Sequence, residues 1–316
     1  MITDRIDAET QIPAAFRNPF CPAPRSIKIE VSPRCPLRCS FCSLKTRETQ
    51  PREDMDFDLF RRITTEAREA GTTQIGVFYI GESFSAPHLL RDCIHWCKKT
   101  LEFPYVFLTS NAALATPGHV EDCMRAGLDS LKWSVNAADE DQYCELMCVS
   151  KKYFHRALAN IKAAHEVRER GKYKCGLYAS SIRYDGEQQE KMEALLEKRV
   201  RPFVDQTYWL PLFGEMTRTT NERNAELGFV PTAGNQGRLG NLRDPLPCWT
   251  VFSGHITADG LLSACCFDAD GKFTMADLKE VSLMEGWNSV KFQELRGAHL
   301  AKDVSGTACE GCLAYA

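Results

Sequence analysis

The segment Val31-Ser32-Pro33-Arg34-Cys35-Pro36-Leu37-Arg38-Cys39-Ser40-Phe41-Cys42 carries three cysteines with the spacing C-x3-C-x2-C. It follows the alternating segment Ile27-Lys28-Ile29-Glu30-Val31, which predicts the first strand of a sheet. Three thiolates on a short loop can bind three iron atoms of a 4Fe-4S cluster, which normally takes four cysteines. The fourth iron then stays open to another ligand. We therefore expect the rest of the chain to surround this open iron.

Length and composition limit the class of protein. The 316 residues favour one large domain with a smaller one beside it. The net charge is −3 and no long basic run is present, which argues against a nucleic-acid partner. The chain opens without the apolar segment of a signal peptide, and no stretch reaches the ~18 apolar residues of a membrane span. We therefore expect a cytoplasmic protein with no membrane partner, whose 15 cysteines stay reduced and whose clustered cysteines bind metal or act in catalysis.

Strand and helix signals alternate from residue 27 to residue 210. Strands are expected at residues 27–31, 74–80, 105–109, 131–135, 174–182 and 204–210, and helices at residues 57–70, 87–101, 117–126, 153–170 and 187–199. Units of roughly 25–30 residues in this order predict a parallel sheet covered by helices. About six units are too few for a closed eight-unit barrel, so the sequence predicts an α/β fold with a partial (β/α)6 barrel.

Three segments lie outside this alternation. Residues 1–26 contain prolines at positions 13, 19, 22 and 24 and are expected to form an irregular leader. Residues 211–247 are polar and then rich in Gly, Asn and Pro, which predicts a linker or a loop over the barrel mouth. Residues 248–316 are expected to form a separate small module with cysteines of its own, namely Cys248, Cys265, Cys266, Cys309 and Cys312.

Polar residues follow three of the predicted strands at the point where each strand stops. They are Gly81-Glu82, Ser110-Asn111, and Ser134 with Asn136. Ligands bind at the carboxyl ends of parallel strands, which meet at one edge of the sheet. The cysteine loop lies at the same edge, so we expect one shared site. The alternatives are an ordinary surface acid for Glu82 and capping of the strand ends for the others.

The cysteine spacing and the β/α pattern together resemble the radical SAM superfamily. The aromatic residue that this family places before the third cysteine is Phe41, and its "GGE" element is Ile80-Gly81-Glu82, with Ile in place of the first Gly. The resemblance implies that Cys35, Cys39 and Cys42 hold a 4Fe-4S cluster whose open iron binds S-adenosylmethionine (SAM). It also implies that SAM is contacted by residues at the strand ends, for which the candidates are Phe41, Gly81, Glu82, Asn111, Ser134 and Asn136. Arg183 is a further candidate for the SAM carboxylate, with a solvated charge as its alternative role.

The C-terminal segment resembles the SPASM and twitch modules of radical SAM enzymes. The pattern consists of Cys248, the hairpin Asp259-Gly260-Leu261-Leu262-Ser263-Ala264-Cys265, the segment Trp287-Asn288-Ser289, and Cys309-x2-Cys312. The full SPASM pattern has seven cysteines and two clusters, so the cysteines here fit the shorter twitch form. The resemblance implies one auxiliary 4Fe-4S cluster held by Cys248, Cys265, Cys309 and Cys312. A zinc site on the same four cysteines is the alternative.

Cys265 and Cys266 compete for one ligand position. Neighbouring residues of a strand point to opposite faces, so only one of the two is expected to reach the cluster. The G-x4-C spacing favours Cys265. Cys266 would then be a free thiol near the active site, able to return a hydrogen atom to a substrate radical as an epimerase requires.

The resemblance implies an oxidoreductase or epimerase in which a 5′-deoxyadenosyl radical abstracts hydrogen from the substrate. A flavodoxin or ferredoxin would supply the electron. Only about 26 residues precede the first strand, which leaves no room for the leader-recognition domain common in peptide-modifying relatives. We therefore expect a small carbohydrate-like or natural-product substrate that is dehydrogenated or epimerised. The alternatives are crosslinking or epimerisation of a ribosomal peptide and, from another class, a non-catalytic iron–sulfur sensor or electron carrier.

Overall fold

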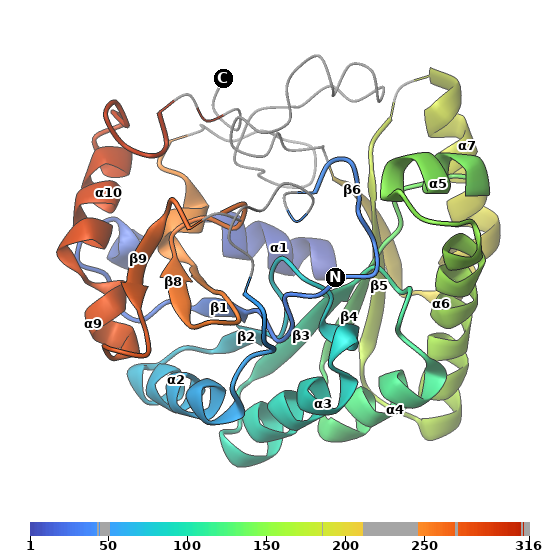
Figure 1. Ribbon diagram of the computed structural model, residues 1–316, viewed down its shortest axis with the longest axis horizontal. Helices are drawn as coiled ribbons and strands as arrows, with labels where there is room; N and C mark the ends of the chain where they lie inside the picture. The colour runs from blue at the N-terminus through green and yellow to red at the C-terminus, as the bar shows by residue number, and fades with distance from the viewer. Residues whose placement is uncertain are drawn as a thin grey trace.

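The computed structural model of the chain describes residues 1–42, 44, 51–184, 186–210, 246–268, 271–310 and 312. Six parallel strands follow one another in sequence order across a twisted sheet (Figure 1). They are β1 (Ser26–Ile29), β2 (Gln74–Gly76), β3 (Tyr105–Ser110), β4 (Ser130–Ser134), β5 (Gly176–Ile182) and β6 (Gln206–Leu210). The six strands confirm the α/β fold with a partial (β/α)6 barrel.

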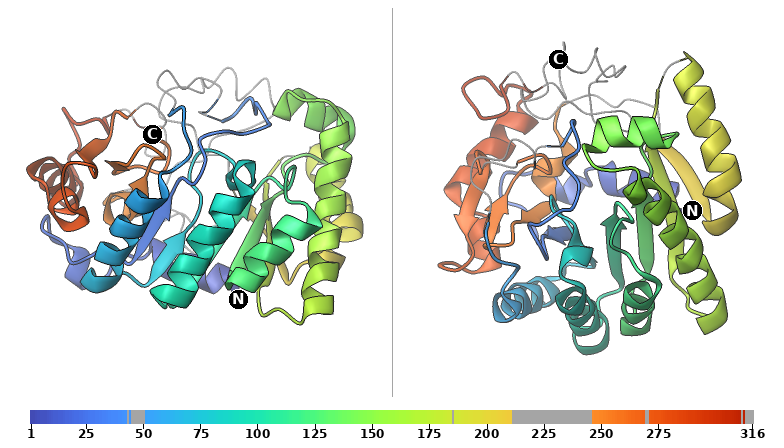
Figure 2. Two further views of the ribbon diagram at one scale, coloured as in Figure 1. Left: turned by 60° about the horizontal axis from the view of Figure 1, so that its bottom comes forward. Right: turned by 45° about the vertical axis from the view of Figure 1, so that its right-hand side comes forward.

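Helices cover the outer face of the barrel (Figures 1 and 2). They are α2 (Phe57–Ala70), α3 (Pro87–His95), which continues as the π-helix η4 (Trp96–Thr100), α4 (Pro117–Ala126), α6 (Lys152–Gly171) and α7 (Gly186–Arg199). Local signals explain their ends. Asp56 accepts the Leu59 N–H at 2.8 Å to begin α2, and Gly71 ends it with φ 105°. One helix that we did not expect, α5 (Glu140–Met147), begins at Asp139, which accepts the Gln142 N–H.

Shorter 3-10 turns connect these elements. They are η1 (Ala14–Phe16), η3 (Ser83–Ser85), η5 (Arg201–Phe203) and η6 (Trp249–Phe252). The turn η3 follows β2 after residues 77–82, and Glu82 caps it by accepting the Phe84 N–H. This turn therefore shapes the edge of the sheet at which the candidate site was expected.

The two faces of the barrel strands differ in character. On β4, Leu131 and Trp133 are fully buried against the helices, whereas Ser130 and Lys132 line the lumen. Strands of a parallel sheet that is covered on both faces read as continuous apolar runs. The alternation here instead reflects an inner face that borders a cavity with polar groups.

The N-terminal segment contains a helix that we did not predict. Residues Ile2–Thr10 form α1, and the prolines that we expected to break this segment begin only at Pro13. The helix lies within the arc of strands (Figure 1) and reaches their amino ends, where the Ile2 N–H donates to Gln206 and Arg5 donates to Gln74. Residues Ile2–Thr10 thus line one end of the lumen, and the expectation of irregular structure does not hold for this part of residues 1–26.

The C-terminal module shares the sheet of the barrel. Its first strand β7 (Gly254–Ile256) pairs parallel with β1, and β8 (Leu261–Ser263) and β9 (Thr274–Asp277) follow antiparallel. The sheet therefore has nine strands within the described residues. The module expected at residues 248–316 thus continues the sheet of the barrel, because the free edge of β1 is a ready partner for another strand.

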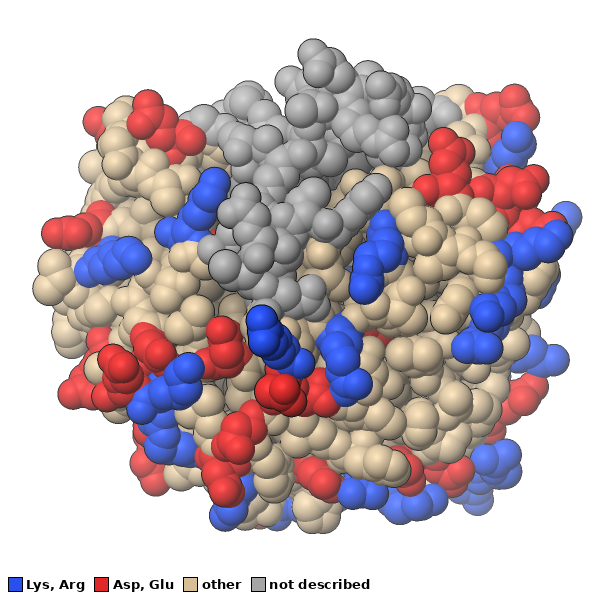
Figure 3. Space-filling view, in the orientation of Figure 1, with Lys and Arg blue, Asp and Glu red and all other residues tan. Residues whose placement is uncertain are grey.

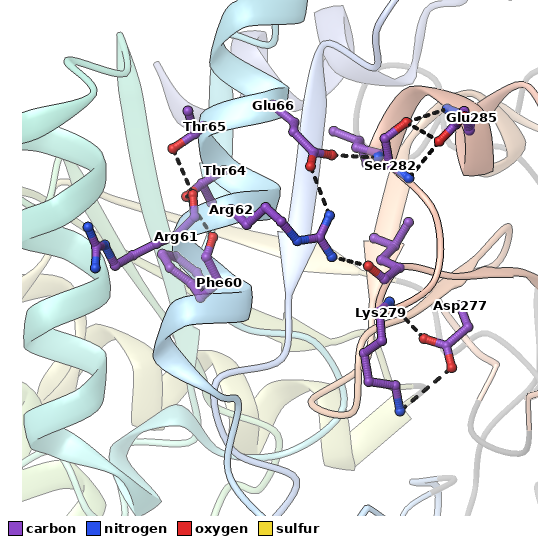
Figure 4. Close-up of polar contacts among 12 residues, drawn as sticks. Phe60, Arg61, Arg62, Thr64, Thr65, Glu66, Asp277, Lys279, Ser282 and Glu285 are labelled. Carbon is purple, nitrogen blue, oxygen red and sulfur yellow. Dashed lines mark hydrogen bonds and ion pairs between the residues drawn. The ribbon is translucent and has the colours of Figure 1, made fainter.

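The helices α9 (Leu283–Trp287) and α10 (Val290–Leu300) complete the module, which docks on α2 (Figure 4). Arg62 on α2 donates to the Leu278 carbonyl, and the Glu66 carboxylate accepts the Leu283 N–H at 2.6 Å. The linker or mouth loop expected at residues 211–247 falls, for residues 211–245, outside the described residues.

On the face seen in Figure 3, acidic and basic side chains are interspersed and form no large patch of a single charge. Within the described parts of the chain, no helix has the length and apolar character needed to cross a membrane.

Candidate functional site

The cysteine loop follows β1 at the carboxyl edge of the sheet. Burial raises the pKa of Cys35 to about 12. The pKa of Cys39 is raised by burial and then by Cys42 and Cys35, so the three thiols lie close enough to influence one another. Buried thiols with raised pKa values stay protonated until a metal displaces the proton. The three sulfur atoms are therefore candidates for the donor set of an iron–sulfur cluster.

Helix α5 holds the cysteine loop in place. The N–H groups of Arg38 and Ser40 donate to the carbonyls of Met147 and Leu146 at 3.0 and 2.7 Å. The Cys39 Sγ lies 3.1 Å from the Met147 Sδ. These contacts give α5, which our sequence analysis missed, a role in positioning the loop.

Gly81 packs against the backbone that leads into the cysteine loop. A Cβ atom at this position would lie 2.8 Å from the carbonyl carbon of Pro33 and closer still to the Ser32 oxygen. The Gly81 N–H donates to the Glu30 carboxylate at 3.0 Å, and the other Glu30 oxygen accepts the Ala258 N–H at 3.1 Å. Glu30, a buried acid within a strand pattern, is a residue that our sequence analysis missed.

Glu82 is a buried structural acid. One carboxylate oxygen accepts the Ser110 hydroxyl at 3.0 Å and the Phe84 N–H at 3.1 Å, and the other accepts the Asn111 N–H at 2.9 Å. Burial raises its pKa, although these three hydrogen bonds favour the charged form. The side chain is therefore not the surface acid that was the alternative, and it connects the ends of β2 and β3.

Asn111 joins the end of β3 to the cysteine loop. Its Nδ2 lies 3.5 Å from the Cys35 Sγ, within the range of an N–H to sulfur hydrogen bond. Its Oδ1 accepts the Ala113 N–H at 2.9 Å, which fixes the orientation of the amide. Asn111 therefore contacts a candidate cluster ligand directly.

The other predicted SAM contacts are distributed around the same edge. Ser134 ends β4 beside Ser180 of β5, and the Asn136 Oδ1 accepts the Ile182 N–H at 3.2 Å. Phe41 is half-buried in the loop. The Arg183 side chain is exposed just past β5, so the structure does not bring it into the group.

Tyr143 on α5 is a second residue that our sequence analysis missed. Its side chain is 7% exposed, and its hydroxyl has no hydrogen-bond partner among the described residues. Burial raises its pKa, followed by the effects of Cys39, Cys35 and Glu82, so the hydroxyl lies among the groups of the site. An unpartnered buried hydroxyl beside two thiols is expected where a cluster or its ligand completes the hydrogen bonding.

A second group of cysteines lies in the C-terminal module. Burial raises the pKa of Cys309 to about 12, followed by the effects of Cys248 and Cys312. Cys248 in turn contributes to the raised pKa of Cys265. The four cysteines expected to hold an auxiliary cluster therefore lie near one another.

His299 connects two of these cysteines. The Cys248 N–H donates to its Nδ1 at 3.2 Å, and its Nε2 lies 3.2 Å from the Cys309 Sγ. Burial lowers the pKa of His299 to about 4, so the ring is neutral and carries one proton. Because Nδ1 accepts a hydrogen bond, the proton lies on Nε2, which donates to Cys309.

The argument that separated Cys265 from Cys266 does not hold in the structure. Both residues follow β8 in a turn, so the alternation of a strand does not apply to them. A hydrogen bond between the two thiols raises the pKa of Cys265 and lowers that of Cys266, which is lowered further by Lys28. The assignment of Cys265 as the ligand and Cys266 as a hydrogen donor remains a prediction.

Tyr79 bridges the two groups of cysteines. It lies beyond the end of β2, and its hydroxyl donates to the Cys265 carbonyl at 2.6 Å. Its ring lies 5.6 Å from that of His255 on β7. The edge that carries the cysteine loop is thereby joined to the C-terminal cysteines.

A single metal ion does not fit either group. Among the described residues, no three His, Cys, Asp or Glu side chains lie close enough to hold one ion. Zinc binds four ligands at about 2.0–2.3 Å around one centre. A cluster of four irons instead places its cysteines on separate metal atoms.

The lumen of the barrel contains a cavity of about 290 Å³. Its walls are formed by α1, by inward-facing residues of β1 to β4 and β6, and by Trp249, Ser253 and Gly254 of the C-terminal module. Most of the wall is apolar, as in small-molecule sites. The cavity is a candidate place for the part of a substrate that reacts.

Two family models match the chain. The radical SAM superfamily model matches residues 29–197, and the SPASM iron–sulfur cluster-binding domain model matches residues 248–313. These matches confirm the resemblance found in the sequence. With them, the SAM-binding 4Fe-4S cluster and the auxiliary iron–sulfur cluster are confirmed as cofactors.

Similar curated proteins are PqqA peptide cyclases. The protein from Streptomyces rochei is 30% identical over 122 residues, which cover 39% of this chain and 32% of the relative. The one from Methylobacterium nodulans is 28% identical over 122 residues, which cover 38% and 31%. The match thus spans about a third of the length of these relatives.

Solved structures share the fold at low sequence identity. Streptococcus suis SuiB bound to the precursor peptide SuiA has a TM-score of 0.64 and 17% identity, covering 94% of this chain and 71% of SuiB. Native anSMEcpe with bound AdoMet has a TM-score of 0.63 and 11% identity, covering 87% and 83%. BtrN in complex with AdoMet and 2-DOIA has a TM-score of 0.57 and 14% identity, covering 91% and 92%.

Proposed function

Because the chain belongs to the radical SAM superfamily, we propose that it is an enzyme that modifies a peptide, by crosslinking two positions or by epimerising one. The observation that carries this proposal is the sequence similarity to PqqA peptide cyclases over 122 to 128 residues, which cover 38–40% of the chain. It supports the alternative of our sequence analysis over the carbohydrate-like substrate preferred there.

The residues of the site would have three separate roles in this reaction. Cys35, Cys39 and Cys42 would hold the cluster at which SAM binds, and this pair of cofactors supplies a 5′-deoxyadenosyl radical. Asn111 and the hydroxyl of Tyr143 would orient the groups bound at the cysteine loop. The cavity would hold the reacting part of the substrate away from water, which protects reactive species from side reactions.

The size of the cavity supports insertion of one part of a peptide. A volume of about 290 Å³ lies at the lower end of ligand sites and suits a side chain or a short segment. The auxiliary cysteines lie beside the same lumen, since Trp249, next to Cys248, forms part of its wall. These cysteines would therefore hold a cluster that could supply redox chemistry close to the cavity.

One structural neighbour favours the alternative of a small-molecule substrate. BtrN, a neighbour of similar fold, is bound to 2-DOIA, whereas SuiB is bound to a precursor peptide. Both likenesses concern the fold alone at these identities. The sequence similarity to the peptide cyclases therefore decides which substrate class we propose.

The test begins with anaerobically reconstituted protein, SAM and dithionite. Formation of 5′-deoxyadenosine is expected, and its absence would contradict an enzymatic function and favour a sensor or electron carrier. Peptides encoded by short reading frames beside the gene are then added. A product lighter by two hydrogen atoms indicates crosslinking, and unchanged mass with deuterium uptake from solvent indicates epimerisation. Turnover of sugars or aminocyclitols without turnover of any peptide would contradict the proposal.

A further inference from the structure

Two lysines on different strands of the sheet line the same cavity. Lys28 lies in the middle of β1 and Lys132 in the middle of β4, and both line the lumen. The strands β2 and β3 lie between β1 and β4 in the curved sheet (Figure 1). Lys28 is nonetheless close enough to Lys132 to lower its pKa. Lys132 precedes Ser134 by two residues on the same face, so the pair lies one layer below the candidate SAM contacts.

The described wall of the cavity carries an excess of positive charge. Its cations are Arg5, Lys28 and Lys132, and its one carboxylate is Glu9. Glu9 is already engaged, since it accepts the Gln74 amide at 3.0 Å and lies 4.0 Å from Arg25, which is not part of the wall.

Arg5 is also engaged, because its guanidinium stacks on the Tyr105 ring at 3.6 Å. By contrast, neither lysine ammonium group forms an ion pair or a hydrogen bond with any residue that the structure describes. The Lys28 ammonium has only the Trp249 ring, 5.3 Å from its centroid, as a favourable neighbour. The two ammonium groups are therefore the unsatisfied charges of the cavity.

Among the described residues that line the cavity with the pair, none but Glu9 is a carboxylate, and the acidic group that Lys28 influences is the Cys266 thiol, whose pKa it helps to lower. Lys132 has its pKa lowered to about 8 by burial and by Lys28, which shows the cost of two cations in one partly desolvated space. His255 lies beside Lys28 in the strand register, and its pKa is lowered by burial and by Lys28, so its ring is neutral. An anion between the lysines would relieve this repulsion and gain two charge-assisted hydrogen bonds.

We propose that Lys28 and Lys132 bind a carboxylate of the substrate inside the barrel. This inference rests on the proposed function, which makes the substrate a peptide. The carboxylate then belongs either to an acidic side chain or to the C-terminus of the peptide. The apolar wall formed by Phe107, Leu210 and Trp249 suits the methylene groups that carry such a carboxylate.

The test uses reconstituted enzyme with SAM and three capped tripeptide probes in isothermal titration calorimetry. They are acetyl-Ala-Glu-Ala-amide, its neutral Gln counterpart, and acetyl-Ala-Gln-Ala with a free C-terminal carboxylate. One of the two anionic probes is expected to bind at least about tenfold more tightly than the neutral probe. The anionic probe that is preferred identifies the source of the carboxylate.

Variants connect the preference to the lysines. Lys132→Met and Lys28→Met are expected to abolish the preference, Lys132→Arg to retain part of it, and Lys162→Met, on the exposed face of α6, to leave it unchanged. SAM affinity should remain unchanged in all four variants. If Lys132→Met weakens SAM binding and leaves the probe preference intact, the lysine belongs to SAM and the proposal is overturned.

The remaining outcomes separate this inference from the proposed function. Glutarate, a free dicarboxylate, is titrated as a fourth ligand. The carboxylate site is overturned if the three probes bind equally, or if neither the probes nor glutarate bind, even where SAM is still cleaved. Binding of glutarate alone, lost in Lys132→Met, supports the carboxylate site and contradicts a peptide substrate.

Discussion

The amide Nδ2 of Asn111 lies 3.5 Å from the Sγ of Cys35. The contact joins the end of the third strand to the first cysteine of the loop. The Asn111 backbone is held in turn by Glu82, so three segments of the chain meet at one sulfur atom. An N–H group directed at a cysteine ligand is one of the factors that set the potential of an iron–sulfur cluster.

Asn111→Ala is therefore expected to lower the midpoint potential of the SAM-binding cluster, because the reduced cluster loses a hydrogen bond that stabilises its added charge. Redox titration followed by electron paramagnetic resonance measures this potential, and the signal that changes when SAM is added identifies the cluster. Asn136→Ala is the control in titrations without SAM, since the Asn136 side chain accepts the Ile182 N–H and contacts no cysteine among the described residues. Its midpoint potential should equal that of the wild type. An unchanged potential in Asn111→Ala would show that the contact has no electrostatic effect.

Gly81→Ala is expected to destabilise the protein by about 1–3 kcal/mol, because its Cβ would overlap the backbone of Ser32 and Pro33. Urea denaturation of the cluster-free protein measures the change. Gly118→Ala is the matched control, since a Cβ there meets no atom within 4 Å and Ala favours the helix. Equal stability of the two variants would contradict the close packing at Gly81.

Tyr143→Phe is expected to leave the stability of the cluster-free protein unchanged, because the hydroxyl has no partner among the described residues. In the reconstituted protein the same change should weaken SAM binding by about tenfold, as expected for one lost hydrogen bond near a charged group. Equilibrium dialysis with labelled SAM provides the measurement. If Tyr143→Phe binds SAM as tightly as the wild type does, the Tyr143 hydroxyl makes no contact with the bound cofactors.

Cys265→Ala and Cys266→Ala decide which thiol binds the auxiliary cluster. Cys265→Ala is expected to leave about four iron atoms per chain and Cys266→Ala about eight, since each cluster contains four. If Cys266 is the hydrogen donor, Cys266→Ala should also lose deuterium uptake into the product while it retains both clusters. The reverse pattern of iron content would exchange the two roles.

His299→Phe is expected to lower the midpoint potential of the auxiliary cluster, because the Nε2–H of His299 donates to the Cys309 Sγ. In the redox titration, the electron paramagnetic resonance signal of the auxiliary cluster is the one that does not change when SAM is added. His95→Phe, on the exposed end of α3, provides the control. A shift of equal size in both variants would indicate a general effect and not the hydrogen bond.

Local signals made much of the fold predictable. The helix expected at residues 117–126 has these bounds in the structure, because Thr116 and Pro117 begin it and Gly127 ends it with φ 108°. Each of these signals acts within a few residues of the helix end. The cysteine loop was equally accessible, since three thiols of one cluster share a single short segment.

Long-range packing explains what we missed. α1 is stabilised by contacts with Gln74 and Gln206, which are remote in sequence. Glu30 gains its role from Gly81 and Ala258, which lie beyond the ends of β2 and β7. No pattern near residue 30 distinguishes a buried acid with two such donors from an exposed one.

The sequence by itself determined the cofactor chemistry of this protein, because the spacing of Cys35, Cys39 and Cys42 and the alternation of strands and helices are local properties. Only the tertiary structure decided which residues meet around that chemistry. A strand has two faces, and its pattern does not tell which of them a curved sheet turns inward. The curvature placed Lys28 and Lys132 in the wall of one cavity, and the pairing of β7 with β1 brought the second group of cysteines beside it.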